Sequence, residues 1–103
     1  MPRALSLATA LVLDALGRGF RHGFDILDAT GLPSGTVYPI LRRLEQDGDA
    51  RSRWEAAKRA QDEQRPPRRY YELTRDGQAR LDEARARFPI LNALPAKGRT
   101  RRA

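Results

Sequence analysis

The sequence predicts a mainly α-helical domain with one small β-hairpin, in the element order of a winged helix-turn-helix. Three segments in the first half of the chain carry apolar residues at helical spacing, and a fourth follows near the C-terminus. Two strand-like segments lie between the third and the fourth. With 103 residues, the chain has the length of a single domain.

The first helix is expected from Leu5 to Leu16, with apolar residues around almost its whole circumference. Such a helix is buried on more than one side, and in so small a protein the second side is expected to contact another subunit. Asp14 interrupts the apolar stretch, which favours a helix over a signal peptide. Gly17 and Gly19 are typical of a helix end.

The next segment, residues 20–31, predicts a short second helix with Phe20, Phe24 and Leu27 on its apolar face. The letters GLP then predict a tight turn into the following segment. Two helices joined by a short turn, of which the second is amphipathic, form a helix-turn-helix pattern.

The third helix is expected over residues 34–48, although it contains a proline. Its apolar face comprises Val37, Ile40, Leu41 and Leu44. Pro39 lies near the helix start, where few backbone hydrogen bonds exist to be lost. Gly35, four residues earlier, is expected to leave room for the proline ring. The opposite face then carries Tyr38, Pro39 and Arg42 toward a partner.

A two-stranded hairpin is expected to follow the third helix. Residues 50–56 alternate in polarity, and residues 68–74 contain two tyrosines and a leucine. Residues 57–67 show neither a period nor core residues, and Pro66-Pro67 blocks regular strand pairing. The sequence therefore predicts a hairpin, the wing, with a long basic loop.

A last helix is expected after the hairpin. Thr74 can cap it, and Asp76 suits the positive end of the helix dipole in its first turn. Its apolar stripe comprises Leu81, Ala84 and Phe88. Pro89 discourages the helix from continuing past this stripe, and a second, short apolar piece follows.

The charge of the chain is unbalanced, with 20 Lys and Arg against 13 Asp and Glu and a net charge of +7. This excess suits a polyanion such as nucleic acid. It is concentrated at Arg65, Arg68 and Arg69 and in the tail. Arginine-rich composition is also typical of proteins from GC-rich genomes, so composition leaves the partner open.

Four stretches, HGFDIL, GTVYPILRRLEQDG, SRWE and PPRRYYELTRDGQARL, resemble the PadR family of bacterial transcriptional regulators, from about Leu5 to Leu81. The C-terminal part resembles the shorter members, whose single last helix helps to form a dimer. The resemblance implies a winged helix-turn-helix DNA-binding domain over residues 1–74, a C-terminal dimerisation helix region over 75–94 and a basic flexible tail over 95–103. It implies a cytoplasmic, homodimeric regulator of double-stranded DNA, most typically a repressor at an inverted repeat, and it leaves any small-molecule inducer unidentified.

The resemblance makes residues 34–48 the recognition helix. Its tyrosine and proline can press on thymine methyls or sugars, its arginines can reach phosphates or guanine, and its N-terminus attracts phosphate. The candidate DNA-binding residues are Ser34, Gly35, Thr36, Tyr38, Pro39, Arg42 and Arg43 in the helix and Arg65, Arg68 and Arg69 in the wing. The candidate dimer interface comprises Leu5, Leu81, Ala84 and Phe88. A helix face and a loop that are merely solvated are the alternatives.

The sequence departs from the family at Asp49-Ala50, where an apolar pair is usual. This change is expected to weaken the base of the wing or to leave Asp49 exposed at a turn. Trp54 and Tyr71 are expected to stack across the hairpin or to cover the core. An aromatic drug-binding surface is the alternative.

The sequence lacks the residues that metal binding, catalysis or membrane insertion would require. The chain has no cysteine, and His22 is its one histidine, so a metal site is not expected and His22 is given a structural role. No catalytic constellation, cofactor motif or membrane span is recognisable. The competing interpretation is a winged helix that binds another protein and has no DNA target.

Overall fold

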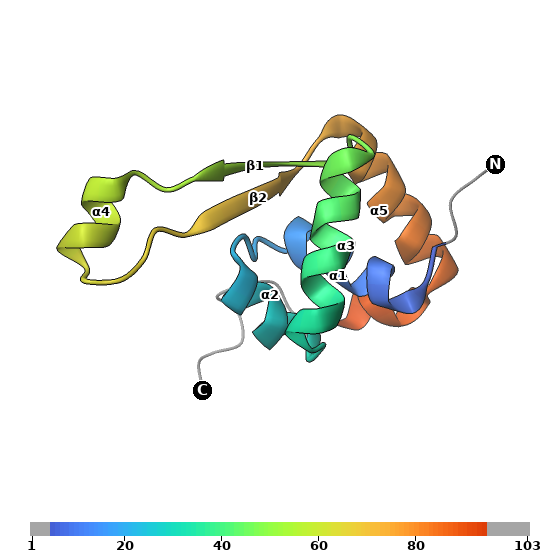
Figure 1. Ribbon diagram of the computed structural model, residues 1–103. Helices are drawn as coiled ribbons and strands as arrows, with labels where there is room; N and C mark the ends of the chain where they lie inside the picture. Colours follow the sequence, from blue (N-terminus) through green and yellow to red (C-terminus); the bar gives the residue numbers. More distant parts are fainter. Residues whose placement is uncertain (1–4, 95–103) are drawn as a thin grey trace.

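The computed structural model describes residues 5–94, and its elements follow the order expected of a winged helix-turn-helix (Figure 1). In this part of the chain they are α1 (Leu7–Gly17), α2 (Gly23–Thr30), α3 (Ser34–Gln46), β1 (Ala50–Trp54), α4 (Ala57–Asp62), β2 (Arg69–Leu73), α5 (Arg75–Arg87) and the 3-10 helix η1 (Pro89–Ala93). The predicted fold class is confirmed. The predicted tail over residues 95–103 lies outside the described residues.

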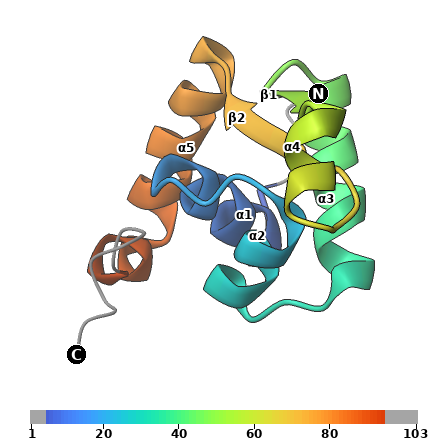
Figure 2. The same ribbon diagram turned by 90° about the vertical axis from the view of Figure 1, so that its left-hand side faces the viewer.

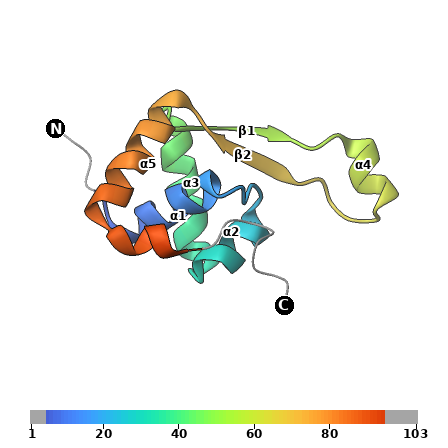
Figure 3. The ribbon, with the colours of Figure 1, turned by 180° about the vertical axis from the view of Figure 1, so that it is seen from behind.

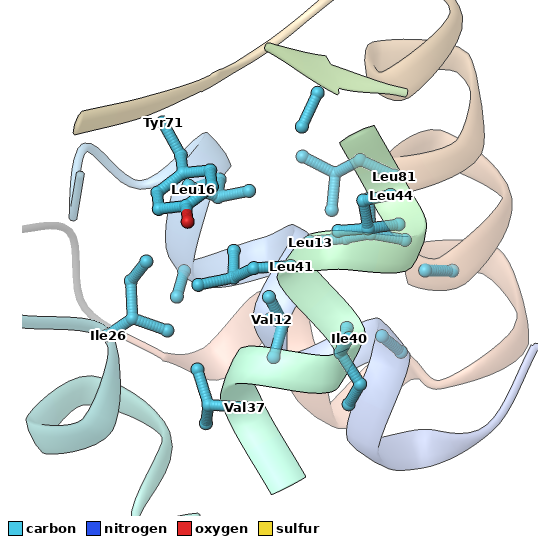
Figure 4. Packing of buried hydrophobic residues seen from close by; sticks show 14 of the residues in the cluster. Val12, Leu13, Leu16, Ile26, Val37, Ile40, Leu41, Leu44, Tyr71 and Leu81 are labelled. Carbon is cyan, nitrogen blue, oxygen red and sulfur yellow. The ribbon is translucent and has the colours of Figure 1, made fainter. Parts of the chain in front are cut away.

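α1 is the central helix of the core. Its N-terminus is capped by Ser6, whose hydroxyl accepts a hydrogen bond from the backbone N–H of Thr9 at 3.1 Å, so the helix begins two residues later than expected. The helix packs against α2, α3, β2 and α5, and Val12 and Leu13 are fully buried (Figure 4). It is therefore buried on more than one side, and α5 of the same chain covers one of these sides.

α2 presents Ile26 to the core, where it is fully buried. The sequence had predicted a different face, comprising Phe20, Phe24 and Leu27. The prediction was wrong for Phe24, which is 75% exposed, whereas Phe20 and Leu27 are half-buried and pack against the core. The helix begins only at Gly23, because His22 is held in a β-bridge with Tyr70, so the residues before it do not share the helical spacing.

α3 packs against α1 through the predicted apolar face (Figure 4). All four of its residues are buried, namely Val37, Ile40, Leu41 and Leu44. The helix continues through Pro39, which lies on the exposed side and removes a single backbone donor. A β-carbon added at Gly35 would meet no atom within 4 Å. The glycine is therefore not needed to accommodate the proline ring, and that part of the prediction was wrong.

β1 and β2 form an antiparallel hairpin that begins with Ala50 opposite Leu73. The backbone N–H of Tyr71 in β2 also donates to the carbonyl of Arg21 at 2.8 Å, so the segment before α2 holds the wing on its other edge. The hairpin projects well beyond the helices (Figures 1 and 3). Both strands are shorter than the predicted spans of 50–56 and 68–74.

The tip of the wing is folded, whereas the sequence predicted a long loop over residues 57–67. It contains the short helix α4 (Figure 2). Ala60 of this helix is buried. The Glu55 carboxylate, whose side chain is 3% exposed, accepts hydrogen bonds from both terminal nitrogens of Arg65 at 2.6 and 2.7 Å. It also accepts one from the backbone N–H of Arg68 at 3.2 Å. These bonds, that of Arg65 above all, lower the pKa of Glu55 to about 2.

Asp49 is buried at the base of the wing, so the expectation that it would lie exposed at a turn was wrong. Its backbone N–H donates to the carbonyl of Leu44 at 2.8 Å, and its own carbonyl accepts from the N–H of Thr74 at 3.0 Å. Its carboxylate lies 3.8 Å from Nε of Arg80 in α5. Asp49 thus joins α3, the hairpin and α5, and β1 starts at Ala50 as expected.

α5 covers α1 on the side away from the wing tip (Figures 1 and 3). Thr74 caps it as predicted, since its hydroxyl accepts from the backbone N–H of Gly77 at 3.1 Å. Leu81 and Ala84 are fully buried. The helix ends before the proline, as predicted, and η1 follows with Leu91 in the core.

Candidate nucleic-acid interface

The outer face of α3 carries the side chains that the sequence assigned to DNA. Tyr38, Pro39, Arg42 and Arg43 are exposed along one side of the helix, opposite the buried face. Neither arginine has an ion-pair partner among residues 5–94. An exposed helix face with two uncompensated guanidinium groups can bind phosphates or the acceptor edge of guanine.

The N-terminus of α3 is also open to a partner. Ser34 and Gly35 are exposed, Thr36 is half-buried, and the first turn contains no acidic residue. The cap residue is Pro33, which offers no side-chain acceptor to the first backbone N–H groups. Pro39 has no N–H, so the carbonyl of Gly35 lacks its usual donor four residues later. The exposed N-terminus of α3 therefore offers a ligand both backbone N–H donors and the carbonyl acceptor of Gly35.

Tyr38 leaves α3 toward the first residue of α2. It is 39% exposed, and its ring lies so close to Gly23 that a β-carbon there would be 2.8 Å from Cζ and 2.9 Å from Cε1. Tyr38 and Gly23 also line a cavity of about 390 Å³ between α2, α3 and the wing. Its aromatic lining includes Phe24, the 63% exposed Trp54 and the buried Tyr71.

Arg69 fixes the wing to α3. Its Nε donates to the hydroxyl of Ser52 at 2.9 Å, and its terminal nitrogen lies 3.3 Å from the carboxylate of Glu45 in α3. The Ser52 hydroxyl in turn donates to Glu45 at 2.7 Å. The guanidinium also covers the rings of Trp54 and Tyr71, at 5.5 and 5.8 Å from their centroids. Trp54 and Tyr71 are therefore linked by an arginine, with only Tyr71 in the core.

Arg65 and Arg68 have different surroundings, although the sequence grouped them with Arg69. Arg65 is 18% exposed and is held by Glu55 and Glu63, and the hydrogen bonds that it donates to Glu55 raise its pKa. It therefore shapes the wing tip. Arg68 is half-buried, and its guanidinium has no ion-pair partner in the described part of the chain, so its charge is not already neutralised by a carboxylate there.

The outer face of the hairpin adds basic residues that the sequence reasoning did not single out. Arg51 and Arg53 alternate with the inward residues of β1, and both line a cavity of about 240 Å³ together with Arg21. Arg51 is bound to Glu72 at 2.8 Å, whereas Arg53 is exposed and has no ion-pair partner within residues 5–94. The alternation of polarity along β1 could have identified these arginines, since a strand places every second side chain on the same face.

The four candidate interface residues are not equally available to a second subunit. Leu81 and Ala84 are fully buried within the chain, Leu5 is 9% exposed and Phe88 is half-buried. The large apolar side chains that are exposed near them are Leu7 and Ile90, at 47% and 68%.

The described residues contain no group of three or more His, Cys, Asp or Glu side chains that could hold a metal ion. His22 instead lies edge-on to the ring of Tyr70 and pairs with Asp25 at 3.3 Å, which agrees with a structural role. Within residues 5–94, no helix is long and apolar enough to cross a membrane.

Residues 12–83 match the model of the transcriptional regulator PadR-like family. A search of curated proteins finds no significant match. The structure is similar to a PadR family transcription regulator from Clostridium difficile R20291, with 20% identity over 85% of this chain and 93% of that chain and a TM-score of 0.70. It is similar to a PadR-like transcription factor from Bacteroides fragilis, with 29% identity over 82% of each chain and a TM-score of 0.65. It is also similar to BpsR of Bordetella bronchiseptica, whose DNA binding is regulated by 6-hydroxynicotinic acid, with 23% identity over 90% of this chain and 67% of that chain and a TM-score of 0.69.

Proposed function

The chain belongs to the PadR-like family of transcriptional regulators, and on that premise we propose that it is a homodimeric repressor that binds an inverted-repeat operator. Members of this family are transcriptional regulators and not enzymes. A regulator of bacterial genes works where the chromosome lies, so we place the protein in the cytoplasm.

One observation carries this proposal. The exposed face of α3 combines Tyr38 and Pro39 with Arg42 and Arg43, and the wing projects beside it with Arg68. The apolar pair suits thymine methyls and sugars, and the arginines suit phosphates and guanine. In winged and other helix-turn-helix proteins the second helix of the motif enters the major groove. We therefore assign base reading to α3 and backbone contacts to the wing.

A dimer would present two copies of this surface to an inverted-repeat operator. Two recognition helices related by a two-fold axis fit successive major grooves, about 34–36 Å apart, which requires an inverted repeat. We place the two-fold contact at the first turn of α1 and at η1, where Leu7 and Ile90 expose apolar surface. α1 and α5 pack together, which brings these two ends to one side of the molecule (Figures 1 and 3).

The alternative is a winged helix that binds a protein and has no DNA target. Fragments of the host genome bound by the protein are selected, and the enriched duplex and a scrambled duplex are titrated at several salt concentrations. We expect preferential binding of the enriched duplex and a linear fall of log affinity with log salt, because phosphate contacts release counterions. Binding that shows no preference and no salt dependence would favour the protein-interaction module.

A further inference from the structure

Gly23 occupies the first position of α2, and its backbone does not explain why it is a glycine. Positive φ angles, where glycine is favoured, occur among the described glycines at Gly19, Gly31 and Gly48 only. Gly23 has an ordinary φ, so any residue could adopt its conformation. Alanine is also the better helix former at such a position. Something other than backbone conformation therefore requires the absence of a side chain here.

The space that a side chain would need is filled by Tyr38 of the recognition helix. A β-carbon at position 23 would lie 2.8 Å from Cζ and 2.9 Å from Cε1 of that ring, and closer still to its hydroxyl oxygen. These distances are shorter than van der Waals contact. By contrast, a β-carbon at Gly35 in α3 would meet nothing within 4 Å. The glycine requirement at position 23 is thus specific to the tyrosine.

We infer that Gly23 is a positioning residue that sets the direction in which Tyr38 leaves the recognition helix. The ring rests against the start of α2, and Tyr38 and Gly23 both line the cavity between α2, α3 and the wing. A ring held in one rotamer before binding loses less side-chain entropy when DNA arrives. This inference rests on the proposed function, because it assumes that Tyr38 reads the operator.

The geometry also indicates that Gly23 controls the direction of the ring rather than folding. The atoms that an added methyl group would meet belong to the outer end of a flexible side chain on an exposed helix face. The tyrosine can turn away without moving the backbone of α2 or α3. Gly23→Ala should therefore leave the fold intact and move the ring out of its place.

The experiment is a double-mutant cycle with Gly23→Ala, Tyr38→Ala and the double variant, titrated on the enriched duplex and on a scrambled one. We expect each single variant to weaken binding to the enriched duplex by about 5-fold to 150-fold for each half-site, the range expected when each subunit loses one base interaction, with a smaller effect on the scrambled duplex. The double variant should bind like Tyr38→Ala alone, since the added methyl group then has no ring to displace. Full binding by Gly23→Ala beside a weakened Tyr38→Ala would overturn the inference.

A readout without DNA separates this inference from the proposed function. The chain has three tyrosines, so ring NMR signals of labelled tyrosine can be assigned with Tyr→Phe variants. Gly23→Ala should shift the signals of Tyr38 more than those of Tyr70, which contacts the neighbouring His22. If Tyr38→Ala affects both duplexes equally, base reading by this residue fails, and the NMR result alone decides: unmoved Tyr38 signals overturn the inference, and shifted ones support it.

Thermal unfolding covers the case in which Gly23→Ala weakens the fold. If crowding of the ring is the cause, adding Tyr38→Ala should return the melting temperature to that of Tyr38→Ala alone. A double variant that stays as unstable as Gly23→Ala would mean that the backbone needs the glycine, and the inference would fall.

Discussion

The Asp14 carboxylate is fully buried and is held between two arginines. It lies 2.6 Å from Nε of Arg18 in the next turn and 3.0 Å from Nε of Arg85 in α5. These contacts join α1 to α5, residues 71 positions apart in the chain. A buried carboxylate is tolerated only when it is paired in this way.

Removing this carboxylate should destabilise the protein strongly. We expect Asp14→Ala to lower the free energy of unfolding by about 3–5 kcal/mol, because it removes the buried carboxylate that pairs with Arg18 and Arg85. Urea unfolding of the variant measures this loss. Arg85→Ala is the matched control: its side chain is one-third exposed, so a smaller loss is expected, and equal losses would contradict this assignment.

Arg68 and Arg69 are neighbours in the sequence but should respond differently to mutation. Arg68→Gln should reduce the slope of log affinity against log salt by about one for each phosphate that is no longer bound, hence by about two in a symmetric dimer. Arg69→Gln should change the slope less, because Arg69 is already bound to Glu45 and Ser52. Titration of both variants at several salt concentrations tests this, and a larger change with Arg69→Gln would reverse the two roles.

At the scale of an element, the wing is a braced hairpin. Its base is held by the buried Asp49, its middle is tied to α3 through Arg69, and its tip is folded around Glu55. A pair of strands alone is marginally stable in water. These attachments let the wing project from the helices and still present a defined surface.

The tip of the wing should loosen in acid. The pKa of Glu55 falls from 4.5 to about 2 on folding, so its ionised form stabilises the tip above pH 4.5, and this contribution is lost as the pH falls toward 2. The protection of the α4 amides against hydrogen exchange, taken relative to the intrinsic exchange rate at each pH, should fall between pH 5 and pH 2. Glu55→Gln should exchange faster already at pH 5 and show less pH dependence. Identical pH profiles for both proteins would show that other carboxylates control the tip.

At the scale of the whole molecule, the distribution of apolar surface decides how two copies can meet. Leu81 belongs to the core of one chain, whereas Leu7 and Ile90 lie exposed at one side of it. Isolated exposed apolar residues are common on protein surfaces. We infer a subunit contact for Leu7 and Ile90 because both lie beside the contact between α1 and α5.

A charge at this surface should separate the subunits without unfolding them. Ile90→Asp should shift sedimentation from dimer toward monomer, because the charge would be buried without a partner in the two-fold contact. Leu81→Asp should instead unfold the chain, since this residue is fully buried. Ala57→Asp, at the distant wing tip, adds the same charge and should leave the oligomeric state unchanged. A monomeric unmodified protein would refute the proposed interface.

The elements were predictable because their signals are local. Val37, Ile40, Leu41 and Leu44 repeat at the helical period, and Thr74 is followed by a helix whose first turn it caps, so short-range spacing sufficed for α3 and α5. The same spacing misled at α2, where counting from Phe20 crossed into a segment that a β-bridge keeps extended. The short helix α4 was missed because its one buried residue, Ala60, leaves no periodic pattern.

The sequence by itself determined the winged helix-turn-helix order, the buried and exposed faces of α3 and the basic character of the wing. Only the tertiary structure decided which of these residues remain available to a partner. Arg69 meets a carboxylate 24 positions away, and Tyr38 meets the bare backbone of Gly23 in another helix. Such contacts depend on how the elements are placed in space. Local periodicity indicates which side of an element faces the core, but it does not indicate which residues of other elements that side contacts.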